Sequence, residues 1–326
     1  MKLIAQMGFL LLTGSLLCGC STSAAQREAP RGTTNEQARF AAEASDHARP
    51  HADLCCLMNT INTLKQIHTD SYETNIPSEA KPLLTALKHE LLDLIVEILA
   101  SEGGGVSAQE IEARAIVDLR NSGIAVKEQG CVFVDENYVD RGYDYGAIHG
   151  ITVTRPRPCF NLLAVTTSIG VCCGEDTSLY LFKHEGRKWK LVLADEVNDY
   201  QLVSGARGTF EFGVTWPDDH GRFVVVATSV NPWCTSNWQA ITYRVLRPGP
   251  APSEPRVVLL SQTQIIWLGD EPPYRLDVHD AGFTLSFHDE RCMDLLSRGE
   301  EVSIDDPRGM RIVKYSVEGD SVRRKN

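Results

Sequence analysis

The sequence predicts an α+β protein in which a small N-terminal helical segment is followed by an antiparallel all-β region of repeated meanders. Across residues 53–123, apolar side chains recur every three or four positions, which is the period of an amphipathic helix. From about residue 130, short runs rich in Val, Ile, Thr and aromatic residues alternate with turn residues, which is typical of antiparallel strands. The 43 acidic residues exceed the 32 Lys and Arg, for a formal net charge of −11, and this opposes nucleic acid as a partner because phosphate binding needs a basic face.

A positively charged start and a short apolar run predict that residues 1–19 are a signal peptide. Lys2 precedes an apolar run over residues 3–17, which is short for a span of about 30 Å of hydrocarbon but suits the core of a signal peptide. The run ends in Leu17-Cys18-Gly19-Cys20. This tetrapeptide resembles the lipobox of bacterial lipoproteins, and the resemblance covers this region of the chain alone.

The lipobox resemblance implies cleavage before Cys20, a diacylglyceryl thioether on its sulfur, and acylation of the new amino group. Each buried methylene contributes ~0.8 kcal/mol, so several acyl chains hold a protein firmly on a membrane. Ser21 follows, where an Asp would resemble an inner-membrane retention signal. We therefore expect a lipid-anchored protein of the bacterial cell envelope, on the periplasmic face of the outer membrane. The alternative is an ordinary secretory peptide cleaved after Ala24 or Ala25.

The mature chain divides into three predicted parts. Residues 20–50 are the lipidated Cys and a flexible tether, because they are rich in Ser, Thr, Ala, Gln and Glu and contain Pro30 and Pro50. Residues 51–128 are the helical region, in which a Ser107–Glu110 capping box begins the third helix and Gly123 ends it. Its apolar stripes should pack on each other or on the next region. The charged residues of the long middle helix are assigned to its solvent side: Lys88, Glu90, Asp93 and Glu97.

Residues 129–326 form the predicted antiparallel β domain. Twelve strands are expected in meanders that start near residues 161, 209, 264 and 311, a spacing of about 50 residues. Four short strands in each repeat of 40–50 residues resemble the blades of a β-propeller. A small propeller, an open array of meanders and a sandwich all fit the pattern. The expected strands are 161–169, 178–183, 188–194, 209–215, 222–229, 239–246, 256–260, 265–268, 274–278, 283–287, 310–316 and 321–324.

The cysteines beyond the lipobox indicate structural disulfides, with free thiols and a metal or redox site as the alternatives. An exported protein is expected to cross-link its cysteines, although spacing alone does not choose the pairs. A zinc site would need two pairs of closely spaced ligands, and the sequence has none; no metal and no cofactor are predicted. His279 and His288 flank one predicted hairpin whose tight turn keeps their rings apart. The disulfide candidates in the β domain are Cys131, Cys159, Cys172, Cys173, Cys234 and Cys292.

The stretch 231–238 is the most distinctive candidate for ligand binding. Trp233, Asn237 and Trp238 combine aromatic rings that can stack on a ligand with an amide that can orient it. The alternative is a loop folded over a meander, with Cys234 and the rings buried. We expect a non-catalytic module that binds an envelope protein or the cell wall. A second hypothesis is a hydrolase or carbohydrate-acting enzyme with its site near Trp233 and Trp238 and with Asp218 and Asp219 as its acids. A third hypothesis is an assembly subunit that docks through its helices.

Overall fold

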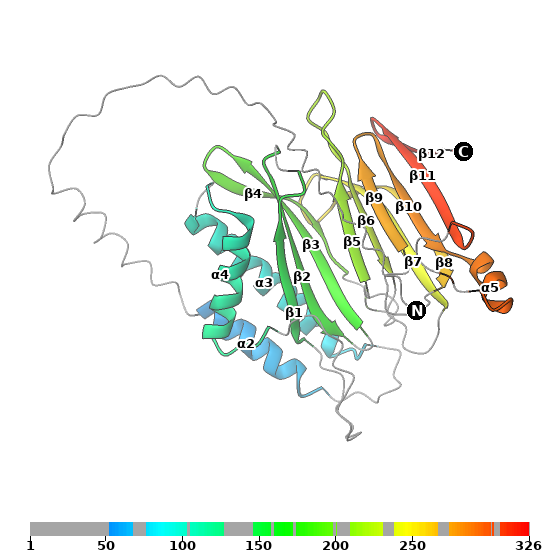
Figure 1. Cartoon of the computed structure of the whole chain (residues 1–326). Helices are drawn as coiled ribbons and strands as arrows, with labels where there is room; N and C mark the ends of the chain where they lie inside the picture. Colours follow the sequence, from blue (N-terminus) through cyan, green and yellow to red (C-terminus); the bar gives the residue numbers. More distant parts are fainter. Residues whose placement is uncertain are drawn as a thin grey trace, which may run out of the picture. The chain divides into compact units, whose positions relative to one another are not determined.

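The computed structural model describes residues 52–67, 76–102, 105–126, 146–157, 160–171, 174–197, 200, 209–230, 238–266, 274–300, 302 and 307–325. By its contacts the chain divides into two units, residues 1–49 and 50–326, and every described element belongs to the second unit. In that unit three helices are followed by three separate four-stranded antiparallel sheets (Figure 1). The α+β class and the antiparallel meanders are confirmed, and the described strands form no closed barrel.

The helices begin and end where their local sequence requires. They are α2 (Ala52–Leu64), α3 (Ala80–Glu102) and α4 (Ala108–Asn121). The predicted capping box is present at the start of α4, where the Ser107 hydroxyl accepts from the Glu110 amide and the Glu110 carboxylate accepts from the Ser107 amide. Gly123 follows α4 with φ +80°, a conformation that glycine adopts without strain. No helix among the described residues is long and apolar enough to cross a membrane.

Each sheet is a meander in which consecutive strands pair with each other. Sheet A comprises β1 (Ile148–Thr154), β2 (Leu162–Val171), β3 (Gly174–Glu185) and β4 (Lys188–Asp195). Sheet B comprises β5 (Thr209–Val214), β6 (Val225–Val230), β7 (Trp238–Arg247) and β8 (Arg256–Ile266). Sheet C comprises β9 (Tyr274–His279), β10 (Gly282–His288), β11 (Met310–Glu318) and β12 (Ser321–Lys325), with helix α5 (Glu290–Ser297) between β10 and β11.

The structure has fewer meanders than the sequence predicted, and most of them start at other residues. The meanders start at residues 148, 209 and 274, so the structure has three of them and the expected starts near 161, 264 and 311 are wrong. Strand β1 and helix α5 were not predicted, and β8 is one strand where two were expected. The gap between the two expected strands is the polar run Ser261-Gln262-Thr263-Gln264, and these residues pair in regular register with residues 240–243 of β7. Pairing with β7 therefore keeps this polar run in the strand.

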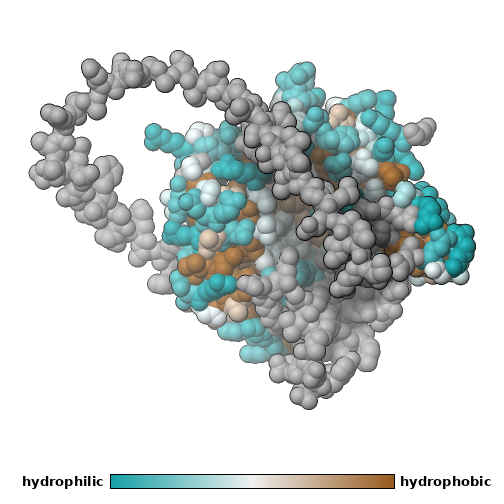
Figure 2. All heavy atoms as spheres, viewed as in Figure 1, coloured by the Kyte–Doolittle hydropathy of each residue, from teal (hydrophilic) through white to brown (hydrophobic). Residues whose placement is uncertain are grey.

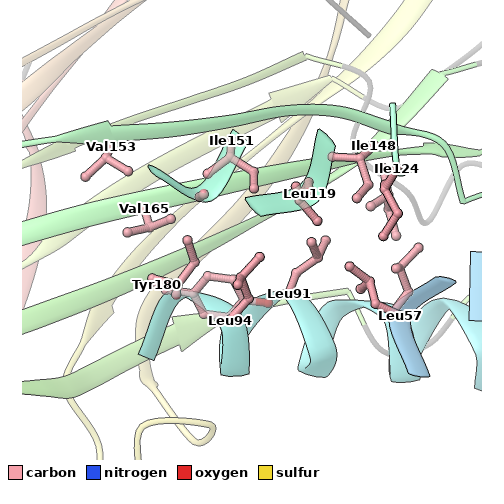
Figure 3. Close-up of a cluster of buried hydrophobic side chains, with 14 of the residues drawn as sticks. Leu57, Leu91, Leu94, Leu119, Ile124, Ile148, Ile151, Val153, Val165 and Tyr180 are labelled. Atoms are coloured by element: carbon pink, nitrogen blue, oxygen red, sulfur yellow. The ribbon is translucent and has the colours of Figure 1, made fainter. Parts of the chain in front are cut away.

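Three apolar layers hold the unit together. The helices pack against one face of sheet A, with Leu91 and Leu94 of α3 lying against Val165 and Tyr180 (Figure 3). The other face of sheet A packs against sheet B, where Leu181 and related residues meet Val225 and Leu246. The far face of sheet B packs against Phe283, Leu285 and Phe287 of sheet C. The predicted packing of the helices on each other and on the β region is therefore confirmed.

One charged side chain is inside the first layer. Lys88 of α3 is 0% exposed, so its assignment to the solvent side of the helix was wrong. Its ammonium group donates to Asp176 Oδ2 at 3.1 Å and to the Tyr200 hydroxyl oxygen at 2.7 Å, and it also contacts the carbonyl oxygen of Val197. The Tyr200 hydroxyl in turn donates to Asp176. These contacts give the buried charge the partners it needs and link α3 to β3 and to the segment after β4.

We expect Lys88→Met to lower the free energy of unfolding by about 3–5 kcal/mol, because it leaves the Asp176 carboxylate buried without its counter-ion. Removing both charges in Lys88→Met with Asp176→Leu should cost less than this single change. Urea denaturation measures both values. Lys190→Met, which removes an exposed lysine on β4, is the control and should change stability little. Equal stability of Lys88→Met and Lys190→Met would contradict the structural role given to Lys88.

Candidate functional site

Many of the residues predicted to carry function lie outside the described residues. These are Cys20 with the rest of the lipobox and tether, Trp233 and Asn237, and the cysteines Cys131, Cys159, Cys172, Cys173 and Cys234. The anchor and the disulfides therefore stay predictions. Among the described residues Cys55 and Cys56 are exposed free cysteines on α2, and Cys292 is buried in α5. The described residues hold no group of three His, Cys, Asp or Glu suited to a metal ion.

Trp238 is the member of the predicted ligand loop that can be placed. It is the first residue of β7 and is 44% exposed. The β7–β8 register puts Gln264 opposite Ala240 and Gln262 opposite Thr242. Since side chains alternate along a strand, these residues share one sheet face with Trp238. The structure thus keeps this aromatic ring exposed and gives it amide-bearing neighbours from a strand that the sequence analysis had not linked to it.

Asp218 and Asp219, the acids of the hydrolase hypothesis, do not lie beside Trp238. Asp218 and Asp219 lie in the connection from β5 to β6, whereas Trp238 follows the connection from β6 to β7. The six residues of β6 separate these two ends of sheet B by roughly 17 Å, at about 3.3 Å per residue. The proposed pairing of these acids with this tryptophan is therefore not formed.

A pocket of about 270 Å³ lies between sheets B and C, at the end where Asp218 is found. One side comes from the β5–β6 connection and the end of β7, and the other from the β9–β10 and β11–β12 turns. Its volume is just below the range of about 300–1,000 Å³ that drug-sized ligands occupy. The lining includes Trp216, Asp218, Arg222, Phe223, Arg247 and Asp280.

The aromatic wall of this pocket is held by an arginine from sheet A. Arg157, which follows β1, donates from Nε to the Val214 carbonyl of sheet B at 2.8 Å and from Nη2 to the Val278 carbonyl of sheet C at 3.0 Å. Its guanidinium carbon lies over the Trp216 ring, 5.5 Å from the centroid. Trp216 still keeps 40% of its surface exposed. The ring is therefore fixed in place while much of it remains open to a ligand.

A buried donor without a partner lies in the same lining. Arg247 is 8% exposed; its Nη1 pairs with Asp320 Oδ1 at 2.9 Å and its Nη2 contacts the Gly319 carbonyl oxygen. Its Nε is buried and has no hydrogen-bond partner among the described residues. Because native proteins rarely leave a buried N–H unsatisfied, this group needs an acceptor that the described residues do not supply.

The carboxylate at the pocket mouth is fixed and ionised. Asp218 accepts from the backbone amides of His220 and Arg222, both at 2.9 Å, and from Arg222 Nε at 2.8 Å. These bonds, with the Arg222 side chain first, lower the pKa of Asp218 to about 2. An acid with this pKa stays deprotonated near neutral pH, so Asp218 serves as a hydrogen-bond acceptor and is a poor general acid.

The pocket combines the groups that bind a small polar ring. Trp216 offers a flat apolar surface, Arg247 and Arg222 offer donors, and Asp218 and Asp280 offer acceptors for hydroxyl groups. A few placed polar groups beside an aromatic wall are the usual composition of a small-molecule site. Asp218 was a sequence candidate, whereas Trp216 and Arg247 were not. These two residues are 31 positions apart, and only the pairing of β6 with both β5 and β7 brings them to one end of sheet B.

The histidines flanking the β9–β10 hairpin do not form a site. His279 pairs with Gly282 beside the turn, and His288 is at the far end of β10, so the expectation that their rings stay apart is confirmed. His279 is exposed, as expected for a turn residue, whereas His288 is 4% exposed and lies in the protein interior. His279 continues the alternation of exposed residues along β9, whereas the buried His288 departs from the alternation along β10, in which Thr284 and Ser286 are partly exposed.

A third surface lies on the helices, where the assembly-subunit hypothesis predicts a docking site. Val117 of α4 and Val96 of α3 are exposed, and Val117 lines a shallow hollow with Val106 and Ala113. Apolar residues appear in brown among hydrophilic ones over this part of Figure 2. Glu102, Glu110 and Arg114 border the hollow, and they interrupt the apolar surface.

We expect a titration of Asp218 by NMR to give a pKa of about 2, against 3.8 for an ordinary Asp. Arg222→Ala should move this pKa upward, because it removes the largest cause of the shift. The ionised Asp218 carboxylate stabilises its turn through these hydrogen bonds. This stabilisation is fully present above the ordinary pKa of 3.8 and is lost as the pH falls through about 2. An Asp218 pKa that is the same in the two proteins would contradict the role assigned to Arg222.

Comparisons with known proteins return no match for this chain. No family model matches the sequence, no curated protein is similar to it, and no solved structure matches its fold. The chemistry of its own residues is therefore the basis for a function.

Proposed function

We propose that this chain is a lipid-anchored, non-catalytic binding protein of the bacterial cell envelope, with its folded unit on the periplasmic face of the outer membrane. The lipobox-like Leu17-Cys18-Gly19-Cys20 supports the anchor. Residues 21–50 supply a linker of 30 residues, which spans about 30 Å if it behaves as a flexible chain. The unit that it carries, residues 50–326, is large enough to hold its own apolar layers.

The pocket between sheets B and C is the observation that carries the binding role. Its tryptophan is held in place by Arg157 and yet exposed, and its Arg247 Nε faces no acceptor among the described residues. Both side chains are already ordered, so binding a ligand costs little conformational entropy at either of them. A ring with several oxygen atoms would satisfy them, so we favour the glycan of the cell wall over a protein as the partner.

The environments of the buried charged cluster and of Asp218 favour a binding role over catalysis. Lys88, Asp176 and Tyr200 are enclosed by the helix–sheet layer and bonded to one another, so a substrate has no access to them. Asp218 is held ionised by Arg222. These contacts favour a stable scaffold that presents a preformed pocket, and they give no support to the hydrolase alternative near Trp238.

The anchor is tested by fractionating cells that produce the Cys20→Ala variant. We expect this variant to leave the membrane fraction, because the thioether-linked chains can no longer form. Cys18→Ala is the matched control and should stay membrane-bound, since the resemblance gives Cys18 no lipid. Retention of Cys20→Ala in the membranes would contradict lipidation at this residue.

The pocket is tested by co-sedimentation with isolated cell walls. Trp216→Ala should weaken binding at least about tenfold, equivalent to ~1.4 kcal/mol, because it removes the stacking surface. Trp238→Ala is the matched control, since it removes an equally exposed tryptophan from the other end of sheet B, and it should bind as the wild type does. Loss of binding in Trp238→Ala instead would assign the site to the 231–238 stretch. Absence of wild-type binding would refute the cell wall as the partner.

A further inference from the structure

We propose that the free edge of β8 pairs with β8 of a second copy of this chain, so that two B sheets join into one antiparallel sheet about a two-fold axis. β8 is the last strand of sheet B. Ten consecutive residues of this strand, 257–266, contain no charged side chain, Pro or Gly. An edge strand of this composition presents unpaired backbone N–H and C=O groups that another extended strand can complete.

The other edge strands of the described sheets are protected. On the outer edges, β4 carries exposed Lys188 and Lys190, and β12 carries exposed Arg323, Arg324 and Lys325. Charged side chains of this kind are a common means by which proteins prevent edge-to-edge pairing. β8 has no such residue beyond Arg256, its first, and this contrast singles it out.

The remaining edges are protected by charge or by contacts. β9 carries Arg275 and Asp277, and β5 contains Glu211 and packs against β9. At β1, Val126 bridges to Ile148 and the Glu112 carboxylate accepts from the Val153 amide at 2.8 Å. β8 is therefore the edge, among the described strands, that carries no charged side chain over the ten residues 257–266. Helix α5 and strand β12 contact part of β8, and none of the described strands pairs with its outer edge.

Exposed apolar side chains accompany the free backbone. Leu260 is 63% exposed and Val257 is 52% exposed, the former being the most exposed large apolar side chain of the described residues. Gln262 and Gln264 on the same strand are exposed as well. Such side chains lie beside those of an added strand and are removed from water when it pairs.

Charge argues for a second copy as the occupant. In a two-fold antiparallel arrangement each residue of one β8 faces a residue of the other. Since residues 257–266 are uncharged, no register of this stretch with itself opposes two like charges. The two-fold symmetry also closes the assembly at two copies, and it covers both free edges at once.

The net charge sets the sign of the salt dependence. The full sequence carries a formal charge of −11, and the proposed cleavage before Cys20 also removes the positive Lys2. Two copies therefore repel each other at long range, while the uncharged residues 257–266 contribute no ion pair. Added salt screens this repulsion. We therefore expect dimerisation to strengthen as salt rises, which is the opposite of the behaviour of an interface held by salt bridges.

The test is sedimentation of the full chain, purified from membranes in detergent, over a dilution series. The wild type should sediment as a dimer that dissociates on dilution. Leu260→Lys should raise the dimer Kd at least about tenfold, because pairing then places two like charges along a strand pair that otherwise has none and loses the burial of an exposed apolar side chain. Gln264→Lys, which removes no apolar side chain, should also raise the Kd.

Ile312→Lys is the matched control. Ile312 is 53% exposed on β11, a central strand of sheet C, so this change adds the same charge and removes a similar apolar side chain away from any edge. It should dimerise as the wild type does. A monomeric wild type, equal weakening by Leu260→Lys and Ile312→Lys, or a stoichiometric complex with a different protein in place of the dimer would overturn the proposal. Circular dichroism checks that each variant is folded.

Discussion

Sheet A is buried on both faces, and the rest of the folded unit is arranged around that constraint. The helices cover one face and sheet B covers the other. Strand β2 shows the result directly, since nine of its ten residues are buried and its side chains do not alternate between interior and solvent. Without the helices one apolar face of sheet A would lie in water, and without sheet B the other would. The chain therefore needs both the helical region and the second meander to fold as it does.

Polar contacts fix the layers that the apolar contacts bring together. Lys88 ties α3 to β3 and to Tyr200, and Tyr180, beside them on β3, donates to Glu196 at 2.6 Å. Burial and the neighbouring Glu196 carboxylate raise the pKa of Tyr180 well above its usual value, so it stays protonated and keeps donating. On the opposite side of sheet A, Arg157 links the β1–β2 connection to sheets B and C. Apolar area favours stacking, and these directional bonds select the geometry.

The sequence pattern predicted the elements well where one physical signal dominated. Helix periodicity, the Ser107 cap and ten of the strands were readable because each depends on local spacing. The full length of β8 and the presence of β1 were not, since residues 261–264 of β8 and the whole of β1 are held as strand by pairing with β7 and β2. Lys88 was assigned to solvent from its charge alone. Its spacing, four residues after Leu84 and three before Leu91, places it on the apolar stripe, and this spacing was the signal that could have found it.

The candidate site was less predictable because pairing of distant strands creates it. Trp216, Arg247 and Asp280 meet only when sheets B and C pack, and Arg157 reaches them from sheet A. The 231–238 stretch drew attention through composition, yet its Asp218 partner lies at the opposite end of sheet B. Composition identifies residues that are able to bind, whereas topology decides which of them come together.

The proposed envelope role requires one chemical modification, a thioether-linked diacylglyceryl group on the sulfur of Cys20. Mass spectrometry of the protein purified from its native membranes tests this most directly. We expect an amino-terminal peptide that begins at Cys20 and carries a diacylglyceryl group and an acylated amine. An unmodified amino terminus at another residue, such as the one that follows Ala24 or Ala25, would contradict it.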